Sequence, residues 1–109
     1  MIKYKRGDIW FGRKLGTFTK GILSGSRPVL IISNNGWNAE SPTVNVILIS
    51  SKLDKSSPVH IEINLEMKSA INIEQIYTIP KKNLDRFMRS LTKEEMELVE
   101  NTLRYQLNL

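Results

Sequence analysis

Arg27 and Ser50 are the residues whose types and positions best suit chemistry on a phosphate ester. Arg27 opens the apolar run RPVLIIS, and Ser50 stands near the end of the apolar run TVNVILISS. An arginine is always charged and offers a rigid fork of N–H donors that fits a phosphoryl group. A serine hydroxyl can donate a hydrogen bond to a phosphate oxygen. However, an arginine before proline is usually a solvated charge and a serine at a strand end usually forms a turn, so both interpretations stay open.

The reaction that such a pair would serve is the cleavage of RNA without a metal ion. In that reaction the neighbouring 2′-hydroxyl attacks the phosphate. It needs a proton acceptor, stabilisation of charge on the phosphoryl oxygens, and a donor for the leaving 5′-oxygen. Preorganised donors of this kind each contribute roughly a hundredfold in rate or more. His60, the only histidine in the chain, is the usual type of proton shuttle near neutral pH. We expect His60 on a solvated strand face, away from Arg27.

The composition excludes several classes of site. The chain has no cysteine, which rules out disulfides, thiolate metal sites and cysteine nucleophiles. A lone histidine without a tight carboxylate cluster predicts no metal site, and we expect no other cofactor. No apolar run approaches the roughly 20 residues that cross a bilayer, and the start MIKYKRGD lacks the apolar segment of a secretory signal. We therefore expect a cytoplasmic protein that makes no membrane contact, with one domain over residues 1–109.

Positive charge is concentrated in one part of the chain. Sixteen Lys and Arg residues against eleven Asp and Glu residues give a net charge of +5. Between Asp8 and Glu40 there is no acidic residue, while the basic ones in that stretch are Arg13, Lys14, Lys20 and Arg27. Lys and Arg supply sequence-independent affinity for nucleic acid by neutralising phosphates. The pattern is compatible with a polyanionic partner, although many basic proteins bind none.

Short strands precede a single helix in the predicted order of elements. The segments with the apolar or alternating pattern of strands are 7–11, 27–33, 43–51, 59–63, 73–80 and a short one near 84–88. The run 43–51 is almost continuously apolar, so we expect it to be buried on both faces. In the alternating run 59–63 the apolar residues should point inward, and His60 and Glu62 outward. The Asn and Gly residues at 34–36 predict a turn.

The C-terminal segment 91–107 has helical periodicity. Its apolar stripe consists of Leu91, Met96, Val99, Leu103 and Leu107. Thr92 followed by Glu95 matches a capping box. By contrast, the segment 12–26 is rich in Gly, Ser, Thr and Lys, which predicts a long, mobile loop. The architecture expected from this order is a strongly bent antiparallel sheet or barrel with a helix packed on it.

Six segments of the chain resemble, in order, those of the MazF/PemK family of toxins. They are KRGDIWF, SRPVLIISNNGWN, VNVILISSK, SPVHIEI, IEQIYTIPKKNL and LTKEEMELVENTLRYQLNL. The resemblance implies a mainly β fold with a C-terminal helix, an SH3-like small barrel of the PemK/MazF/CcdB type. It also implies a homodimeric toxin that cuts single-stranded RNA sequence-specifically and is neutralised by a cognate MazE-like antitoxin. The expected products carry a 2′,3′-cyclic phosphate and a 5′-hydroxyl.

The resemblance assigns roles to individual residues. Arg27 and Ser50 become the catalytic candidates, with Ser50 standing where many relatives have threonine. The residues expected to contact RNA are Arg13, Lys14, Phe18, Lys20, Ser51, Gln75 and Tyr77. The basic loop would form the rim of the RNA groove. Strand alternation should turn Ser51 away from Ser50. Of Trp10 and Phe11, one should be in the core and the other in the groove or at the dimer surface.

Two positions depart from the family pattern. Where relatives often have arginine and aspartate, this chain has Tyr77 and Pro80, so the acid–base roles of those residues cannot be carried over. Gln75 stays a polar candidate there, and Tyr77 either stacks on a base or is half-buried packing. The departures leave an alternative function open: a non-catalytic, CcdB-like toxin that binds gyrase, or an inactive RNA-binding homologue.

Overall fold

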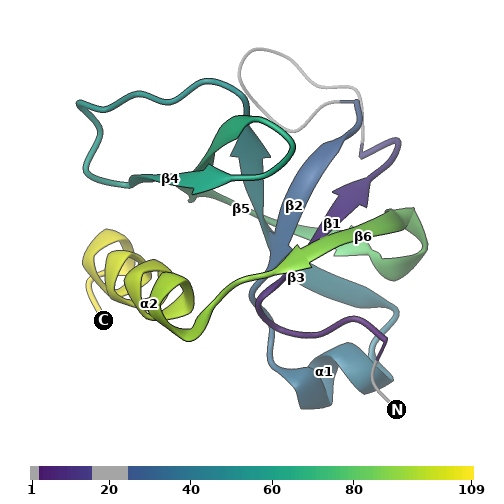
Figure 1. Ribbon diagram of the computed structural model, residues 1–109. Coiled ribbons are helices and arrows are strands. Elements are labelled where there is room, and N and C mark those ends of the chain that lie inside the picture. Colours follow the sequence, from purple (N-terminus) through teal and green to yellow (C-terminus); the bar gives the residue numbers. More distant parts are fainter. Residues whose placement is uncertain (1–2, 16–24) are drawn as a thin grey trace.

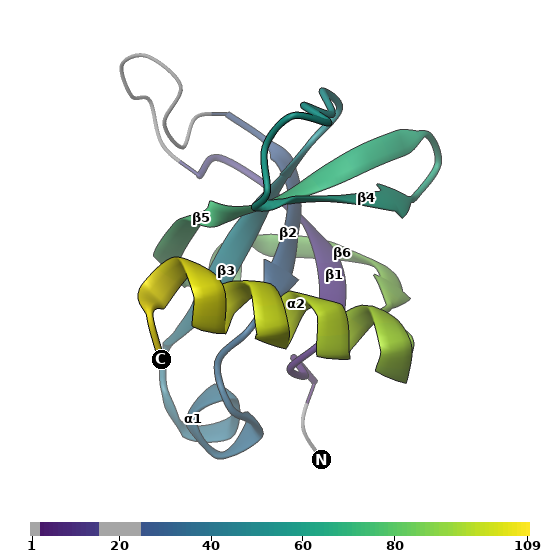
Figure 2. The same cartoon turned by 90° about the vertical axis from the view of Figure 1, so that its left-hand side faces the viewer.

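A computed structural model describes residues 3–15 and 25–109 of the chain (Figures 1 and 2). Strands dominate it, and a long helix follows the last strand, which confirms the predicted mainly β fold with a C-terminal helix. The elements are β1 (Asp8–Gly12), β2 (Arg27–Ile31), α1 (Asn35–Glu40), β3 (Thr43–Ser50), β4 (His60–Asn64), β5 (Lys68–Pro80), the 3-10 turn η1 (Lys81–Asn83), β6 (Leu84–Ser90) and α2 (Lys93–Leu107).

The strands form one antiparallel sheet in the order β4–β5–β3–β2–β1–β6. The sheet curls strongly (Figure 1), as expected for an SH3-like barrel. Side chains join its two edges: Arg89 Nη1 donates to the carbonyl of Asn64 at 3.0 Å, and Arg86 forms an ion pair with Glu66 at 3.3 Å. These contacts hold the two edges of the sheet together and so fix the shape of the concave space inside the curl.

Strand β3 supplies both hydrophobic cores of the sheet. Val44, Val46 and Leu48 belong to one buried cluster, whereas Ile47 and Ile49 belong to the other. Alternate residues of a strand point to opposite faces, so a strand covered on both sides becomes apolar throughout. The prediction that 43–51 is buried on both faces is confirmed for its apolar residues.

Helix α2 covers one face of the sheet (Figure 2). Its residues Met96, Val99 and Leu103 pack against the cluster that contains Ile9 and Ile47. Leu107, however, is 50% exposed, so the prediction that it belongs to the buried stripe was wrong. Eight residues after Val99, a helix has turned by about 80° away from the packed face.

No helix within the described ranges has the length and apolar character needed to cross a membrane.

The predicted capping box at the start of α2 is confirmed. The Glu95 N–H donates to Thr92 Oγ1 at 3.1 Å, and the Thr92 N–H donates to Glu95 Oε1 at 2.8 Å. Both bonds satisfy N–H groups that have no partner inside the helix. The side chains of these two residues thus fix where α2 begins and, with it, how the helix meets the sheet.

A short helix, α1, occupies the place where the sequence predicted a turn at 34–36. The Asn34 side chain accepts from the Trp37 N–H at 2.7 Å and so caps the helix. The buried Asn38 side chain then donates to the Ser33 carbonyl at 2.9 Å. The turn prediction was wrong because asparagine, which favours turns, is also among the best N-cap residues.

Strand β5 begins at Lys68 rather than at residue 73, because its first residues are polar and hide the strand pattern. Its pairing with β3 contains a bulge. Ile47 pairs with Ile76 and Ile49 pairs with Ile71, so the four residues 72–75 stand opposite the single residue Leu48. Bulges of this kind re-aim side chains and often lie beside functional sites.

The described ends of the predicted loop 12–26 are ordered. Gly12 is the last residue of β1, and Leu15 is 7% exposed and packs in the core. The Leu15 N–H donates to the carbonyl of Gly25 at 2.9 Å. The loop therefore starts later than predicted, because an apolar residue anchors its first turn; residues 16–24 lie outside the described part of the chain.

Candidate functional site

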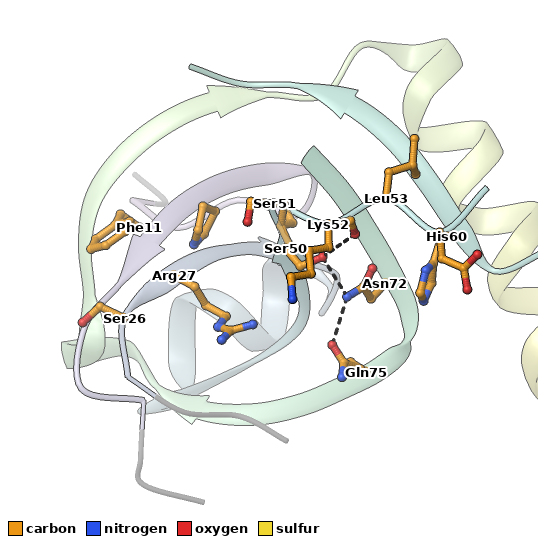
Figure 3. A pocket seen from close by; sticks show the side chains of 13 residues that line it. Phe11, Ser26, Arg27, Ser50, Ser51, Lys52, Leu53, His60, Asn72 and Gln75 are labelled. Carbon is orange, nitrogen blue, oxygen red and sulfur yellow. Dashed lines mark hydrogen bonds between the residues drawn. The ribbon is translucent and has the colours of Figure 1, made fainter. Parts of the chain in front are cut away.

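A pocket of about 710 Å³ lies within the curl of the sheet (Figure 3). Strands β2, β3, β4 and β5 and the link that follows β3 contribute most of its wall. The lining residues are Phe11, Ser26, Arg27, Pro28, Ile49, Ser50, Ser51, Lys52, Leu53, Asp54, His60, Asn72 and Gln75. The pocket thus combines an apolar floor with several polar and charged groups, which is the usual make-up of a ligand site.

Two neighbouring strands bring the two catalytic candidates of the sequence to one pocket. Val29 pairs with Leu48 at the end of the antiparallel β2–β3 ladder, and Arg27 and Ser50 each lie two residues beyond that pair. Both line the pocket. In Figure 3 the Arg27 guanidinium extends into the pocket. Both candidates therefore belong to one wall of the same pocket.

Arg27 has no protein partner for its charge in the described part of the chain. None of the ion pairs there includes it, and its Nε is buried without a hydrogen-bond acceptor. A buried polar group left unpaired costs free energy, all the more when it is charged. An anion in the pocket would supply the missing acceptor, and a phosphate matches the geometry of the guanidinium.

Ser50 is part of a hydrogen-bonded chain of side chains. Its hydroxyl donates to the Lys52 carbonyl at 2.9 Å and accepts from Asn72 Nδ2 at 3.3 Å. Asn72 Nδ2 also donates to Gln75 Oε1 at 3.2 Å. Asn72 is 7% exposed, and its Oδ1 has no partner among the described residues. Asn72 therefore donates its Nδ2 hydrogens to Ser50 and Gln75, whereas its Oδ1 is left to accept from a ligand.

The β5 bulge explains why Asn72 and Gln75 share the pocket. Residues three apart in a regular strand point to opposite faces. The four residues opposite Leu48 break that alternation, so both amides line the same wall. Sequence analysis found Gln75 but missed Asn72, whose only signal is a polar residue between Ile71 and Ile73 in a segment not predicted as strand.

His60 lines this pocket too, so the expectation that it lies on a solvated strand face was wrong. Its side chain is only 15% exposed, and Nε2 lies 2.9 Å from a carboxylate oxygen of Glu74. Its Nδ1 is buried and has no partner within the described ranges. His60 pairs with Asn72 across the β4–β5 ladder, and the curl of the sheet turns that face inward. Glu62, two residues later, is exposed as predicted.

The link after β3 brings two opposite charges to the pocket, Lys52 and Asp54. The Ser56 hydroxyl and backbone N–H donate to Asp54 Oδ1 at 2.6 and 3.0 Å. These hydrogen bonds lower the pKa of the Asp54 carboxyl. A smaller rise from burial opposes them, and the nearby His60 adds the smallest effect, which again lowers the pKa. Across residues 3–15 and 25–109, no group of three or more His, Cys, Asp or Glu side chains could hold a metal ion.

Ser51 and Phe11 also reach the pocket. Ser51 was expected to face away from Ser50, but β3 ends at Ser50 and strand alternation stops there. Ser51 is exposed and lines the pocket beside its neighbour. Of the two adjacent aromatic residues, Trp10 is 7% exposed and packs in the core, while Phe11 lines the pocket. The two aromatic side chains thus divide between core and pocket, one of the alternatives left open by the sequence.

Three of the other candidates, Arg13, Lys14 and Tyr77, lie outside the lining of the pocket. Tyr77 is half-buried and packs against the core cluster. Arg13 forms an ion pair with Asp85 at 2.6 Å, and the Lys14 N–H donates to Ser26 Oγ at 3.3 Å. The remaining two candidates, Phe18 and Lys20, fall outside the described residues.

Comparisons with known proteins point to one family. The model of the family described as PemK-like, MazF-like toxin of type II toxin–antitoxin system matches residues 5–107. Among solved structures, an endoribonuclease in complex with its cognate antitoxin, from a mycobacterial species, is 22% identical, with a TM-score of 0.79 over 100% of this chain and 97% of that one. MazF from Deinococcus radiodurans is 12% identical, with a TM-score of 0.80 over 100% and 99%. The Mycobacterium tuberculosis toxin MazF-mt6 is 18% identical, with a TM-score of 0.78 over 94% and 97%.

Proposed function

Because the chain belongs to the PemK-like, MazF-like toxin family of type II toxin–antitoxin systems, we propose that it is a toxin that cleaves single-stranded RNA in the Arg27 pocket without a metal ion. The observation that carries the proposal is the guanidinium of Arg27, which enters a polar pocket that Ser50 also lines and forms no ion pair with any described residue. A phosphodiester supplies the missing anion. Two of the solved structures that are similar to this fold are named endoribonucleases.

In the proposed reaction, the 2′-hydroxyl attacks the adjacent phosphate and the 5′-oxygen leaves. Arg27 neutralises the charge that builds up on the phosphoryl oxygens. Ser50 turns its hydrogen from the Lys52 carbonyl to a phosphoryl oxygen. The amides of Asn72 and Gln75 hold the nucleotide next to the scissile bond. The products are a 2′,3′-cyclic phosphate and a 5′-hydroxyl.

The remaining candidates are assigned to the path of the RNA beyond the pocket. Ser51 lines the pocket and is exposed, so it is accessible to the RNA strand. Lys52 adds positive charge there. We place the rest along the groove rim, where basic and aromatic residues bind phosphates and bases: Arg13, Lys14, Phe18 and Lys20. Tyr77 packs against the core from outside the pocket lining, which favours a structural role for it.

The proposal extends to partners. One similar structure is an endoribonuclease in complex with its cognate antitoxin, and another is MazE–MazF from Deinococcus radiodurans. We infer that this chain acts as a homodimer in the cytoplasm, with residues 1–109 forming one toxin domain. A MazE-like antitoxin would neutralise it by laying an acidic segment over the basic groove, so that RNA and antitoxin compete for the same charges.

The proposal is tested with purified protein and a long, mixed-sequence RNA in EDTA. The wild type should release fragments with 2′,3′-cyclic phosphate ends, and Arg27→Ala should cleave at least about a hundredfold more slowly because the main charge stabiliser is gone. Arg104→Ala is the matched control, since Arg104 is an exposed arginine on α2, away from the pocket lining. Its rate should equal that of the wild type.

Intact RNA in the presence of folded wild-type protein would refute the proposal. A protein that instead trapped breaks in DNA through gyrase, and left RNA untouched, would favour the CcdB-like alternative. Cleavage that survives Arg27→Ala but not chelation would point to a metal-dependent contaminant or mechanism.

A further inference from the structure

A row of polar side chains crosses four strands inside the pocket. Arg27 begins β2 and Ser50 ends the neighbouring strand β3, Ser50 accepts from Asn72 of β5, and Asn72 pairs with His60 of β4. Neighbouring strands lie about 4.8 Å apart, so three spacings separate Arg27 from His60 by about 14 Å along the sheet, and less across its curl. In Figure 3 Ser50 and Asn72 lie between Arg27 and His60. Because all four residues line one pocket, a nucleotide bound there can contact both Arg27 and His60.

The Glu74 carboxylate determines which nitrogen of the His60 ring carries the hydrogen. Both carboxylate oxygens of Glu74 lie near Nε2, at 2.9 and 3.1 Å. An ionised carboxylate only accepts hydrogen bonds, so Nε2 carries the hydrogen. In the neutral imidazole the lone pair is then on Nδ1. A carboxylate in this position also stabilises the ring after it gains a second proton, as in histidine–carboxylate pairs of hydrolases.

Buried polar atoms without partners gather at this pocket. The described residues have four: Arg27 Nε, His60 Nδ1, Asn72 Oδ1 and Trp10 Nε1. The first three belong to pocket-lining residues, and Trp10 lies in the core. Unsatisfied groups are rare in folded proteins and mark functional positions more often than chance. The lone pair of His60 Nδ1 is thus one of three groups that a substrate in the pocket could satisfy.

We propose that His60 is the general base of the RNA cleavage and that Glu74 is its positioning residue. The inference rests on the proposed function. His60 Nδ1 takes the proton of the 2′-hydroxyl while the 2′-oxygen forms its bond to phosphorus. The bond between phosphorus and the 5′-oxygen breaks, and the 5′-oxygen takes a proton from water. The imidazolium beside Glu74 then returns its proton to water, which restores the free enzyme.

The other charged groups around His60 are less suited to this task. Glu74 of β5 is engaged with Nε2. Asp54 of the link faces His60, but its lowered pKa makes it a weak base near neutral pH. Lys52 and Arg27, the cations of the pocket lining, have no lone pair that could accept the proton. His60 Nδ1 is shielded in the free protein, and catalytic hydrogen bonds often tighten only when substrate is bound.

The test compares the single-turnover cleavage of RNA by the wild type, His60→Ala and Glu74→Gln between about pH 5 and 8, the range in which histidines change charge. His60→Ala should be slower by about a hundredfold or more and should lose the fall in rate at low pH, because no imidazole is left to be protonated. Added imidazole should restore part of the rate. Glu74→Gln should lie between the two. Glu62→Gln, an exposed change on β4, should behave as the wild type.

A second measurement separates the chemical role from a structural one. Each variant is titrated with an uncleavable RNA that has a 2′-deoxynucleotide at the cut position. His60→Ala and the milder His60→Gln should bind it as the wild type does, within about twofold, because the proposed role is in proton transfer rather than affinity. If both variants lose binding, or imidazole restores nothing, the general-base role is overturned. If they cleave at the wild-type rate, His60 has no catalytic role, while the proposed function stands. A wild type that never cleaves would overturn both.

Discussion

Ser50 engages its hydroxyl twice in the free protein, as donor to the Lys52 carbonyl and as acceptor from Asn72. The hydrogen that a phosphate needs is therefore in use, and it becomes available when the O–H bond rotates about Cβ–Oγ or the whole side chain turns about χ1. A threonine at this position would restrict the χ1 rotation through its extra methyl group. In the proposed function, the Ser50 hydroxyl is held by the backbone carbonyl of the link in the free protein and is released when substrate binds.

We predict that Ser50→Ala slows cleavage by about ten- to hundredfold, the range expected for losing one hydrogen bond to a charged group. Ser50→Thr keeps the hydroxyl and should stay within about threefold of the wild-type rate. Single-turnover rates on one defined RNA measure both variants, and their thermal unfolding checks that they are folded. An alanine variant as fast as the threonine variant would show that the hydroxyl takes no part.

At the level of residues, the sequence predicted part of the pocket lining but not the geometry of the pocket. Arg27 and Ser50 were placed in one site, and two neighbouring strands bring them to one pocket. His60 was assigned to a solvated face because alternation in a single strand does not reveal which face a curled sheet encloses. Asn72 was missed because its position depends on a bulge, and a bulge is set by pairing between strands far apart in sequence.

At the level of elements, local signals succeeded where they were strong. The apolar run of β3 and the capping box of α2 were both predicted. The failures were α1, which begins within the turn-like sequence Asn34–Asn35–Gly36, and the polar start of β5. Both elements depend on buried polar side chains such as Asn38 and Ser69. The pattern of hydrophobic residues along the sequence does not reveal such contacts, because the partners come from elsewhere in the fold.

The capping box gives a stability prediction for α2. Thr92→Ala should lower the free energy of unfolding by about 1 kcal/mol, since the Glu95 N–H loses its acceptor. The control is Thr102→Ala, a second threonine of the same helix whose hydroxyl donates to the Leu98 carbonyl at 2.7 Å. Because alanine favours helix interiors and that bond competes with the helix ladder, this change should be neutral or slightly stabilising.

Urea-induced unfolding of the two variants and the wild type measures these free energies. Equal losses in Thr92→Ala and Thr102→Ala would show that the effect does not come from the cap, because a threonine away from the cap would then cost as much to remove. RNA cleavage by Thr92→Ala should be unchanged at temperatures where the variant is folded, because the helix start contributes no residue to the pocket.

At the level of the whole molecule, the curl of the sheet converts charge that is scattered in the sequence into a single site. Several of the basic residues are already balanced: Arg6 pairs with Glu100, Arg13 with Asp85 and Arg86 with Glu66. The net charge of +5 thus says little about where an anion binds. What distinguishes Arg27 is that it lines the enclosed pocket and that, within the described residues, no carboxylate forms an ion pair with it.

The central claim is that the Arg27 pocket cleaves RNA through attack by the substrate's own 2′-hydroxyl. The most direct measurement uses an RNA whose cut positions have been mapped, with one of them replaced by its 2′-deoxynucleotide. In EDTA the wild type should cut every other mapped position to a 2′,3′-cyclic phosphate and leave the substituted one intact, since the nucleophile is missing there. Cleavage at the substituted position at an undiminished rate would contradict the account, because water would then have to be the nucleophile.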